Sequence, residues 1–116
     1  MADLLLNDEN IDAVVIGLDP LSPVTHSLED TDIDAFRMDD PNGILTLLSD
    51  VRSRSSKPLV AVVDGGERFD PLRKALRERG IPMFPVCDRA VAALALYLES
   101  RLAAESLKHA AYCALK

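Results

Sequence analysis

Aromatic residues are scarce in this sequence, and tryptophan is absent. Tyrosine and phenylalanine make up 4% of the 116 residues, whereas apolar residues as a whole make up 48%. The hydrophobic core must therefore be built from closely packed aliphatic side chains rather than from a few large rings. Such side chains suit helices laid on a β-sheet, and a chain of this length is expected to form one domain with one core.

Basic residues are also few. The chain has 13 Lys and Arg against 19 Asp and Glu, a formal net charge of −6, and an excess of acid repels nucleic acid and anionic lipid surfaces. No apolar run approaches the roughly 18 residues of a transmembrane helix. The N-terminal Met1-Ala2-Asp3 is acidic where a secretion signal is basic. We expect a cytoplasmic protein that binds neither nucleic acid nor membranes.

Several cysteine and glycine motifs that carry chemistry are missing as well. The two cysteines, Cys87 and Cys113, belong to no CxxC or Cys/His metal-binding motif. Neither a disulfide framework nor a zinc site is therefore expected, and both thiols should be reduced. Neither G-x-G-x-x-G nor G-x-x-x-x-G-K-[ST] occurs, so glycine loops that bind dinucleotides or nucleoside triphosphates have no support.

What the chain does contain is an alternation of apolar strands and amphipathic helices. Continuous apolar, β-branched runs are typical of strands covered on both faces, and prolines bound them. Strands are expected at 12–18, 59–63 and 81–84. A helix follows each strand, and right-handed crossovers make such a chain a parallel sheet with helices on both faces. The predicted fold class is α/β with three core strands.

The helix boundaries are expected from capping signals. Asp40-Pro41 and Asp70-Pro71 each place an N-cap residue before a proline that the first helical turn tolerates. Asp88 is a third N-cap candidate, for the last helix. Gly80 is expected in the left-handed conformation that ends the preceding helix. Residues 2–9 look like the end of a helix whose start is cut short.

Two stretches of this single domain, 1–116, fall outside the regular pattern. Residues 19–40 are rich in Asp and Glu but hold one cation, Arg37, and are expected to form an acidic loop or insertion. The last helix should reach residue 115, well beyond the width of the sheet. Its extended part, 103–116, is expected to meet another domain or subunit. Open strand edges and this apolar helix surface predict a homodimer.

The turns at the carboxyl ends of the strands are candidates for a ligand- or partner-facing site, because the following helices point their N-termini there. The candidates are Asp19, His26, Asp64, Gly65 and Gly66. The glycines serve a tight turn as readily as a close ligand contact, and no nucleophile accompanies the histidine in a motif. The two aspartates alternatively indicate a small metal-dependent enzyme. No catalytic residue and no metal ligand is assigned.

An ordered set of segments resembles a known family. NDENIDAVVIGL at 7–18 and KPLVAVVDGGERFDPLRKALRERGIPMFPVCDRAVAALALYL at 57–98 are similar to the second flavodoxin-like CoA-ligase domain of the NDP-forming acyl-CoA synthetases, relatives of succinyl-CoA synthetase. The likeness covers 7–102 except 19–40. It implies a flavodoxin-like fold in which the strand before residue 2 is missing, so that the domain is truncated at its N-terminus.

The resemblance implies a part of a synthetase rather than a complete enzyme. Such enzymes interconvert an acid, CoA and a nucleoside triphosphate with acyl-CoA and a nucleoside diphosphate through a phosphorylated histidine in a different domain. That histidine lies beside glycine, which His26 in THSL lacks, so its role is not transferred. CoA, ATP or ADP and Mg²⁺ are implied for a complete enzyme with ATP-grasp and CoA-binding domains or subunits, and none for this chain alone. The alternative is a stand-alone interaction or regulatory domain without enzymatic activity.

Overall fold

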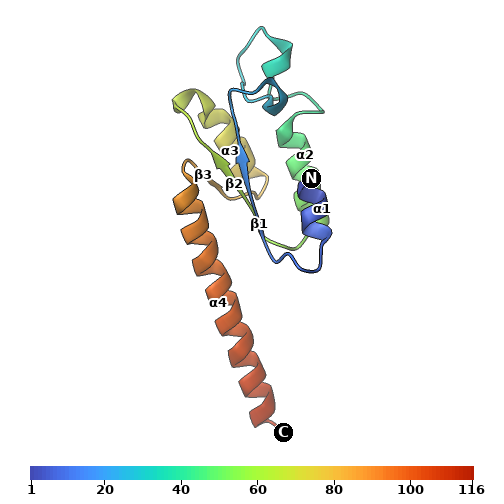
Figure 1. The fold of residues 1–116 in the computed structure, drawn as a ribbon, viewed down its shortest axis with the longest axis vertical. Helices are drawn as coiled ribbons and strands as arrows, with labels where there is room; N and C mark the ends of the chain where they lie inside the picture. Colours follow the sequence, from blue (N-terminus) through green and yellow to red (C-terminus); the bar gives the residue numbers. More distant parts are fainter.

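The computed structural model describes all 116 residues, and a three-stranded parallel β-sheet lies at its centre (Figure 1). The strands are β1 (Val14–Leu18), β2 (Leu59–Val63) and β3 (Met83–Phe84), in the order β1-β2-β3. β1 and β2 pair along their whole length, from Val14 opposite Leu59 onward, whereas β3 pairs with β2 through two residues only. The predicted α/β class with parallel pairing is confirmed.

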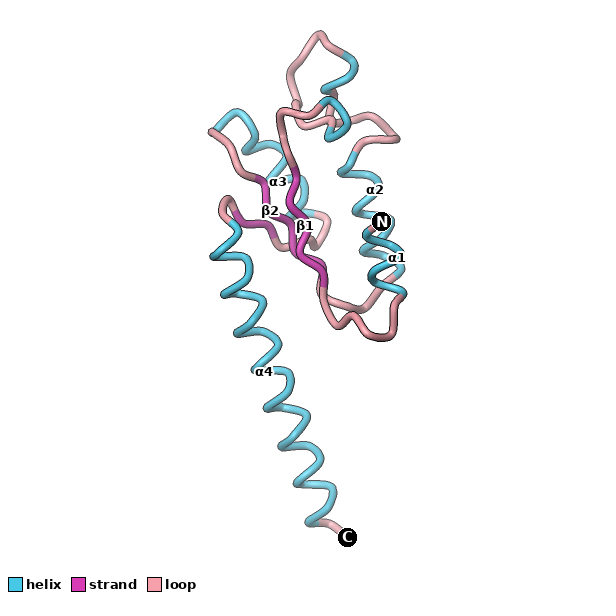
Figure 2. Tube along the Cα trace, viewed as in Figure 1, coloured by secondary structure: helices cyan, strands magenta, loops and turns pink.

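Helices cover both faces of the sheet, as predicted. The short α1 (Ala2–Asn7), α2 (Ile44–Arg54) and α3 (Asp70–Glu78) lie on one face, and α4 (Cys87–Ala114) lies on the other (Figures 1 and 2). The order of the strands in the sheet is the same as their order in the chain. With this order, right-handed crossovers place the connecting helices α2 and α3 on the same face. This layering matches a flavodoxin-like architecture.

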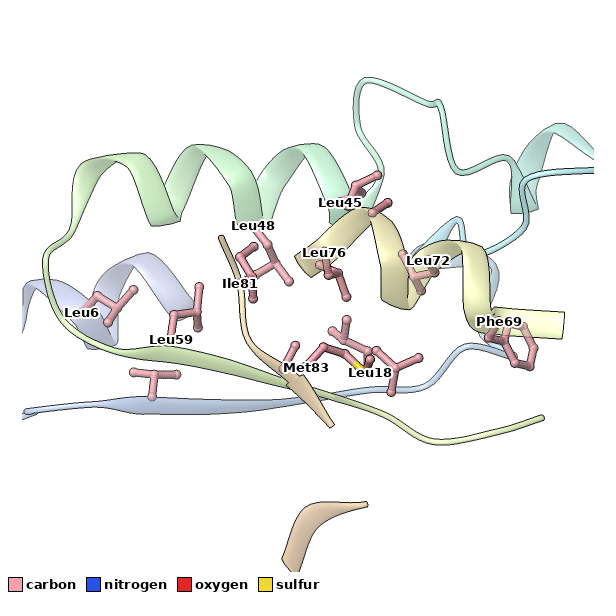
Figure 3. Close-up of a cluster of buried hydrophobic side chains, with 14 residues drawn as sticks. Leu6, Leu18, Leu45, Leu48, Leu59, Phe69, Leu72, Leu76, Ile81 and Met83 are labelled. Carbon is pink, nitrogen blue, oxygen red and sulfur yellow. The ribbon is translucent and has the colours of Figure 1, made fainter. Parts of the chain in front are cut away.

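The central strand β2 organises the core because all five of its residues are buried. Successive side chains point to opposite faces, so Leu59, Ala61 and Val63 join the larger core under α2 and α3, and Val60 and Val62 meet α4. Figure 3 shows leucines of both covering helices pointing toward the strands in the larger core. That core contains 14 buried residues, against three on the side of α4. Most buried apolar side chains therefore lie between the sheet and the layer of α2 and α3.

Three predicted N-caps are wrong, because each aspartate closes a turn or pairs locally instead. α2 begins after Gly43, and the Asp40 carboxylate accepts a hydrogen bond from the Asn42 N–H at 2.7 Å. Asp70 is already the first helical residue of α3, and α4 likewise begins one residue before Asp88. The signal Asp-Pro therefore marks the approach to a helix and not its cap. Gly80, with φ +74°, takes the predicted left-handed conformation.

Other boundaries differ by a few residues at the ends of elements. β1 begins at residue 14 rather than 12, β3 is limited to two residues of the predicted 81–84, and α1 ends at Asn7. The acidic stretch 19–40 has local order: η1 (Pro23–Thr25) and η2 (Asp34–Phe36) are short 3-10 helices joined by a bridge between Leu28 and Arg37. Backbone hydrogen bonds of 2.8 Å on both sides of Leu28 hold that bridge.

α4 reaches Ala114, as the sequence predicts, and makes the molecule elongated, with extents of 65 × 25 × 22 Å. Its first part packs on the sheet through Ala90 and Leu94, and every residue from 99 onward is exposed. Figure 1 shows this second part extending away from the sheet to the C-terminus. No helix combines the length and apolar character that crossing a lipid bilayer requires. Cys87 and Cys113 are both free and exposed.

Candidate functional site

The turns after β1 and β2 lie side by side at the carboxyl edge of the sheet, as parallel pairing requires. Together they line an open pocket of about 370 Å³. Four of the five predicted site residues line it, namely Asp19, Asp64, Gly65 and Gly66. The structure therefore brings together the turns after β1 and β2, whereas the turn after β3 contributes no residue to this pocket.

The two carboxylates of the pocket are each engaged by their own turn. Asp19 Oδ1 accepts a hydrogen bond from the Leu21 N–H at 3.0 Å, and Asp64 Oδ1 accepts one from the Gly65 N–H at 2.7 Å. Both aspartates are exposed. Since a carboxylate that stabilises a turn is a common structural arrangement, these contacts account for both residues without a ligand.

A buried arginine that the sequence analysis missed holds the turn after β2. Arg73 is 7% exposed, and its Nε donates to the Val63 carbonyl at 3.1 Å while Nη1 donates to the Gly66 carbonyl at 3.1 Å. Nη2 donates to the Gly65 carbonyl, and Nη1 also donates to Asp70 Oδ1 at 2.6 Å. One guanidinium therefore binds the end of the strand, both glycines and the start of the helix.

The sequence does contain a signal for this arginine. Leu72, Ala75 and Leu76 mark the buried face of α3, and Arg73 lies three residues before Leu76 and four residues after Phe69, which is also buried. Residues with this spacing share one face of a helix, so a cation there needs buried acceptors. The acceptors are the carbonyls of the glycine turn, which no other side chain binds.

The two glycines of this turn differ in backbone conformation and in the space that a side chain would have. Gly65 has φ +124°, and a Cβ at that position would lie 2.8 Å from Phe69 Cδ2. Gly66 has φ −75°, and a Cβ there would meet nothing within 4 Å. The geometry thus demands glycine only at position 65, where backbone conformation and the neighbouring ring both exclude a side chain.

His26 lies apart from this pocket. Its backbone is left-handed, with φ 47°, and its ring packs against Gly43 with Nδ1 4.0 Å from Asp40 Oδ2. Nδ1 is buried and has no hydrogen-bond partner. The neighbouring hydroxyls of Thr25 and Ser27 donate to backbone carbonyls at 2.6 Å. Neither hydroxyl is therefore paired with the histidine as an activated nucleophile would be.

The acidic loop carries its own ion pairs on the surface. Arg37 donates two hydrogen bonds to Asp39, with distances of 2.8 and 3.1 Å, and lies 3.8 Å from Asp34. The hydrogen bonds from Arg37 lower the pKa of the Asp39 carboxyl below its ordinary value. The single cation of this loop is thus used within the loop.

The donor set of the pocket fits neither a metal ion nor a phosphate. No group of three or more His, Cys, Asp or Glu side chains is arranged to bind a metal anywhere in the chain. The pocket is lined by two carboxylates and no cation, so an anionic group would be repelled. No serine, cysteine or histidine lines it either. The carboxylates of Asp19 and Asp64 are the only ionisable side chains that line it.

Comparisons of this chain with family models, with curated proteins and with solved structures find no match.

The glycine turn gives a sharp test of this description. Gly65→Ala is expected to lower the free energy of unfolding by about 2 kcal/mol, because an L side chain is strained at φ +124° and collides with Phe69. Gly66→Ala is the matched control and should change it by less than about 0.5 kcal/mol. Urea unfolding of the three proteins measures both values. Equal costs for the two substitutions would contradict the turn geometry.

Arg73 should be among the most sensitive charged residues of the chain. Arg73→Met is expected to cost about 2–4 kcal/mol of unfolding free energy, because it removes the four hydrogen bonds that a buried guanidinium makes to Val63, Gly65, Gly66 and Asp70. Arg77→Met, one turn later on the exposed side of α3, serves as the control and should cost less than about 0.5 kcal/mol. Denaturant unfolding is again the measurement. A cost at Arg73 as small as at Arg77 would show that water replaces the guanidinium.

Proposed function

We propose that this chain is a module of an NDP-forming acyl-CoA synthetase or CoA-ligase-like protein, without turnover of its own. The observation that carries the proposal is the ordered set of segments at 7–18 and 57–98, whose three strands form one parallel sheet. The pocket at the carboxyl edge supports an auxiliary role, because it is lined mainly by turn residues and holds no serine, cysteine or histidine.

In this proposal the chemistry belongs to partner domains. ATP-grasp and CoA-binding domains would bind ATP or ADP, Mg²⁺ and CoA, and the phosphorylated histidine would lie in another domain. The first turn departs from the pattern of the family, in which a helix opens directly after the first strand. Here the three-residue η1 follows β1, and α2 begins only at Ile44. The role therefore rests on docking and not on a helix N-terminus after β1.

The second candidate is a stand-alone interaction or regulatory domain, and the exposed part of α4 favours it. Large apolar side chains are left in solvent there: Leu102 is 65% exposed, Leu107 72% and Leu115 87%. Apolar side chains placed along a projecting helix are typical of a surface that packs on another helix. The same surface supports a homodimer.

The module proposal is tested by activity and by association. The purified chain with ATP, CoA, Mg²⁺ and simple carboxylic acids should form no acyl-CoA, because it lacks the groups for phosphoryl transfer. Mixed with separately purified ATP-grasp and CoA-binding domains of a synthetase, it should co-elute with them and restore acyl-CoA formation. Turnover by the chain alone, or failure to bind either domain, would refute the module. Failure to bind would favour the second candidate, the stand-alone interaction or regulatory domain.

Self-association gives a further prediction. Light scattering should report a homodimer at high micromolar concentration, and Leu107→Glu should shift it to a monomer by placing a charge in the apolar helix contact. Glu105→Gln, on the same exposed part of α4, is the control and should remain dimeric. A monomeric wild-type chain at that concentration would contradict the prediction.

A further inference from the structure

A cleft lies at the opposite, amino-terminal edge of the sheet, between α4 and the starts of β2 and β3. Its volume is about 310 Å³, near the lower end of the range for small-molecule sites. The apolar part of the cleft is lined by Pro58, Val60, Phe84, Leu94 and Tyr97. Two of these side chains are aromatic in a chain with few aromatic residues, and Tyr97 is 46% exposed and therefore accessible from solvent.

A polar groove of about 480 Å³ shares Arg52, Ser56 and Gly80 with this cleft. Arg52 and Lys57 line the cleft, and Arg52 and Arg79 line the groove together with several serines. No aspartate or glutamate lines either space, although the chain carries a net charge of −6. The charges that line these two spaces are thus opposite to those of the pocket at Asp19 and Asp64, whereas a neighbouring pocket that shares Lys57 and Tyr97 with the cleft is also lined by Asp12 and Glu105.

None of the three cations of this region forms an ion pair, although Lys57 lies near the carboxylate of Asp8. The ion pairs of the chain include Arg54, which binds Asp3 and Asp50, but none involves Arg52, Lys57 or Arg79. Arg52 lies between the other two, lining the cleft with Lys57 and the groove with Arg79, and cations gathered in this way raise the local potential for an anion. A fourth cation, the paired Arg54, adds little to that potential.

Backbone carbonyls hold the cations in place and leave donors free. Arg52 donates to the carbonyls of Gly80 at 3.3 Å and Ser55 at 3.0 Å, through Nε and Nη1, so both hydrogens of Nη2 are unused. Lys57 Nζ donates one hydrogen bond, to the Asp8 carbonyl at 2.6 Å, and an ammonium group has three donors. These contacts also offset the negative ends of α2 and α3, which terminate at this edge.

We propose that this cleft binds a small aromatic anion, with the ring against Phe84, Leu94 and Tyr97 and the anionic group on Arg52 and Lys57. The apolar wall and the unpaired cations are adjacent in one cavity, which is the combination that such a ligand requires. Arg52 presents the spare donors for a phosphate, sulfonate or carboxylate, and a guanidinium binds such groups in a fork. The proposal does not depend on a role in acyl-CoA synthesis.

The first test uses 1-anilinonaphthalene-8-sulfonate, an aromatic sulfonate that fluoresces in apolar surroundings. The wild-type chain should bind it with a saturable 1:1 signal, and Lys57→Gln should weaken the affinity by about tenfold, as expected for losing a charged donor. Lys108→Gln removes the same charge from the exposed part of α4 and should leave the affinity unchanged. Equal affinity in the wild type and Lys57→Gln would overturn the cationic half of the site.

The second test concerns the apolar half. Ala93 lines the cleft, so Ala93→Leu should fill it and remove the saturable signal while leaving every cation in place. Ala104→Leu makes the same change on the exposed part of α4 and should keep the signal. Retention of the signal in Ala93→Leu would place the probe elsewhere and overturn the proposal. Far-ultraviolet circular dichroism verifies that each variant is folded.

Competition identifies the chemical class. Phenyl phosphate should displace the probe at concentrations at which inorganic phosphate does not, because only the former fills the aromatic part of the cleft. Equal displacement by both would show a simple anion site and refute the aromatic requirement. The titrations are made at one ionic strength, because screening weakens every contact of this kind.

Discussion

The buried guanidinium of Arg73 fixes the end of the central strand, and much of the structure depends on that contact. β2 is covered on both faces, and the chain that leaves it continues through Asp64, Gly65 and Gly66, which are exposed. Arg73 binds the carbonyls of Val63, Gly65 and Gly66 at once. Because Leu72 and Leu76 flank it on α3, the same residue sets the position of the helix on the sheet.

This contact also explains the character of the carboxyl edge. In an open parallel sheet the turns at that edge usually present backbone N–H groups to anionic ligands. Here the carbonyls of the glycine turn face Arg73, while Asp19 and Asp64 cap neighbouring N–H groups. The cations are instead collected at the amino edge, where Arg52 and Arg79 bind carbonyls near the ends of α2 and α3. The two edges therefore favour partners of opposite charge.

The sequence predicts the fold better than the site, for physical reasons. β2 was predicted at its observed bounds because its five apolar residues lie directly between Pro58 and Asp64, which mark the two ends of the strand. The helix starts were wrong because an aspartate stabilises a turn and an N-cap by the same short side-chain contact, and only the three-dimensional path distinguishes them. Four of the five site residues were placed together correctly because parallel pairing alone fixes that neighbourhood.

Arg73 and the amino-edge cleft were missed for a related reason. A lone arginine on a helix is usually solvent-exposed, since charged residues seldom lie in a core, and its spacing from buried residues does not show which carbonyls it meets after folding. The cleft combines Arg52 and Lys57 with Tyr97, which is distant from them in sequence, and the three belong to no motif. Only the position of α4 across the start of β2 brings them together.

The exposed part of α4 persists without contacts to the sheet because its composition favours a helix. It is rich in alanine, the residue with the highest helix propensity, and Arg101 pairs with Tyr97 and Glu105 at i,i+4 spacing. A surface that is already ordered loses little conformational entropy on binding. A partner that packs on this helix therefore gains affinity from side chains such as Leu107 and Leu115 without first having to fold them into place.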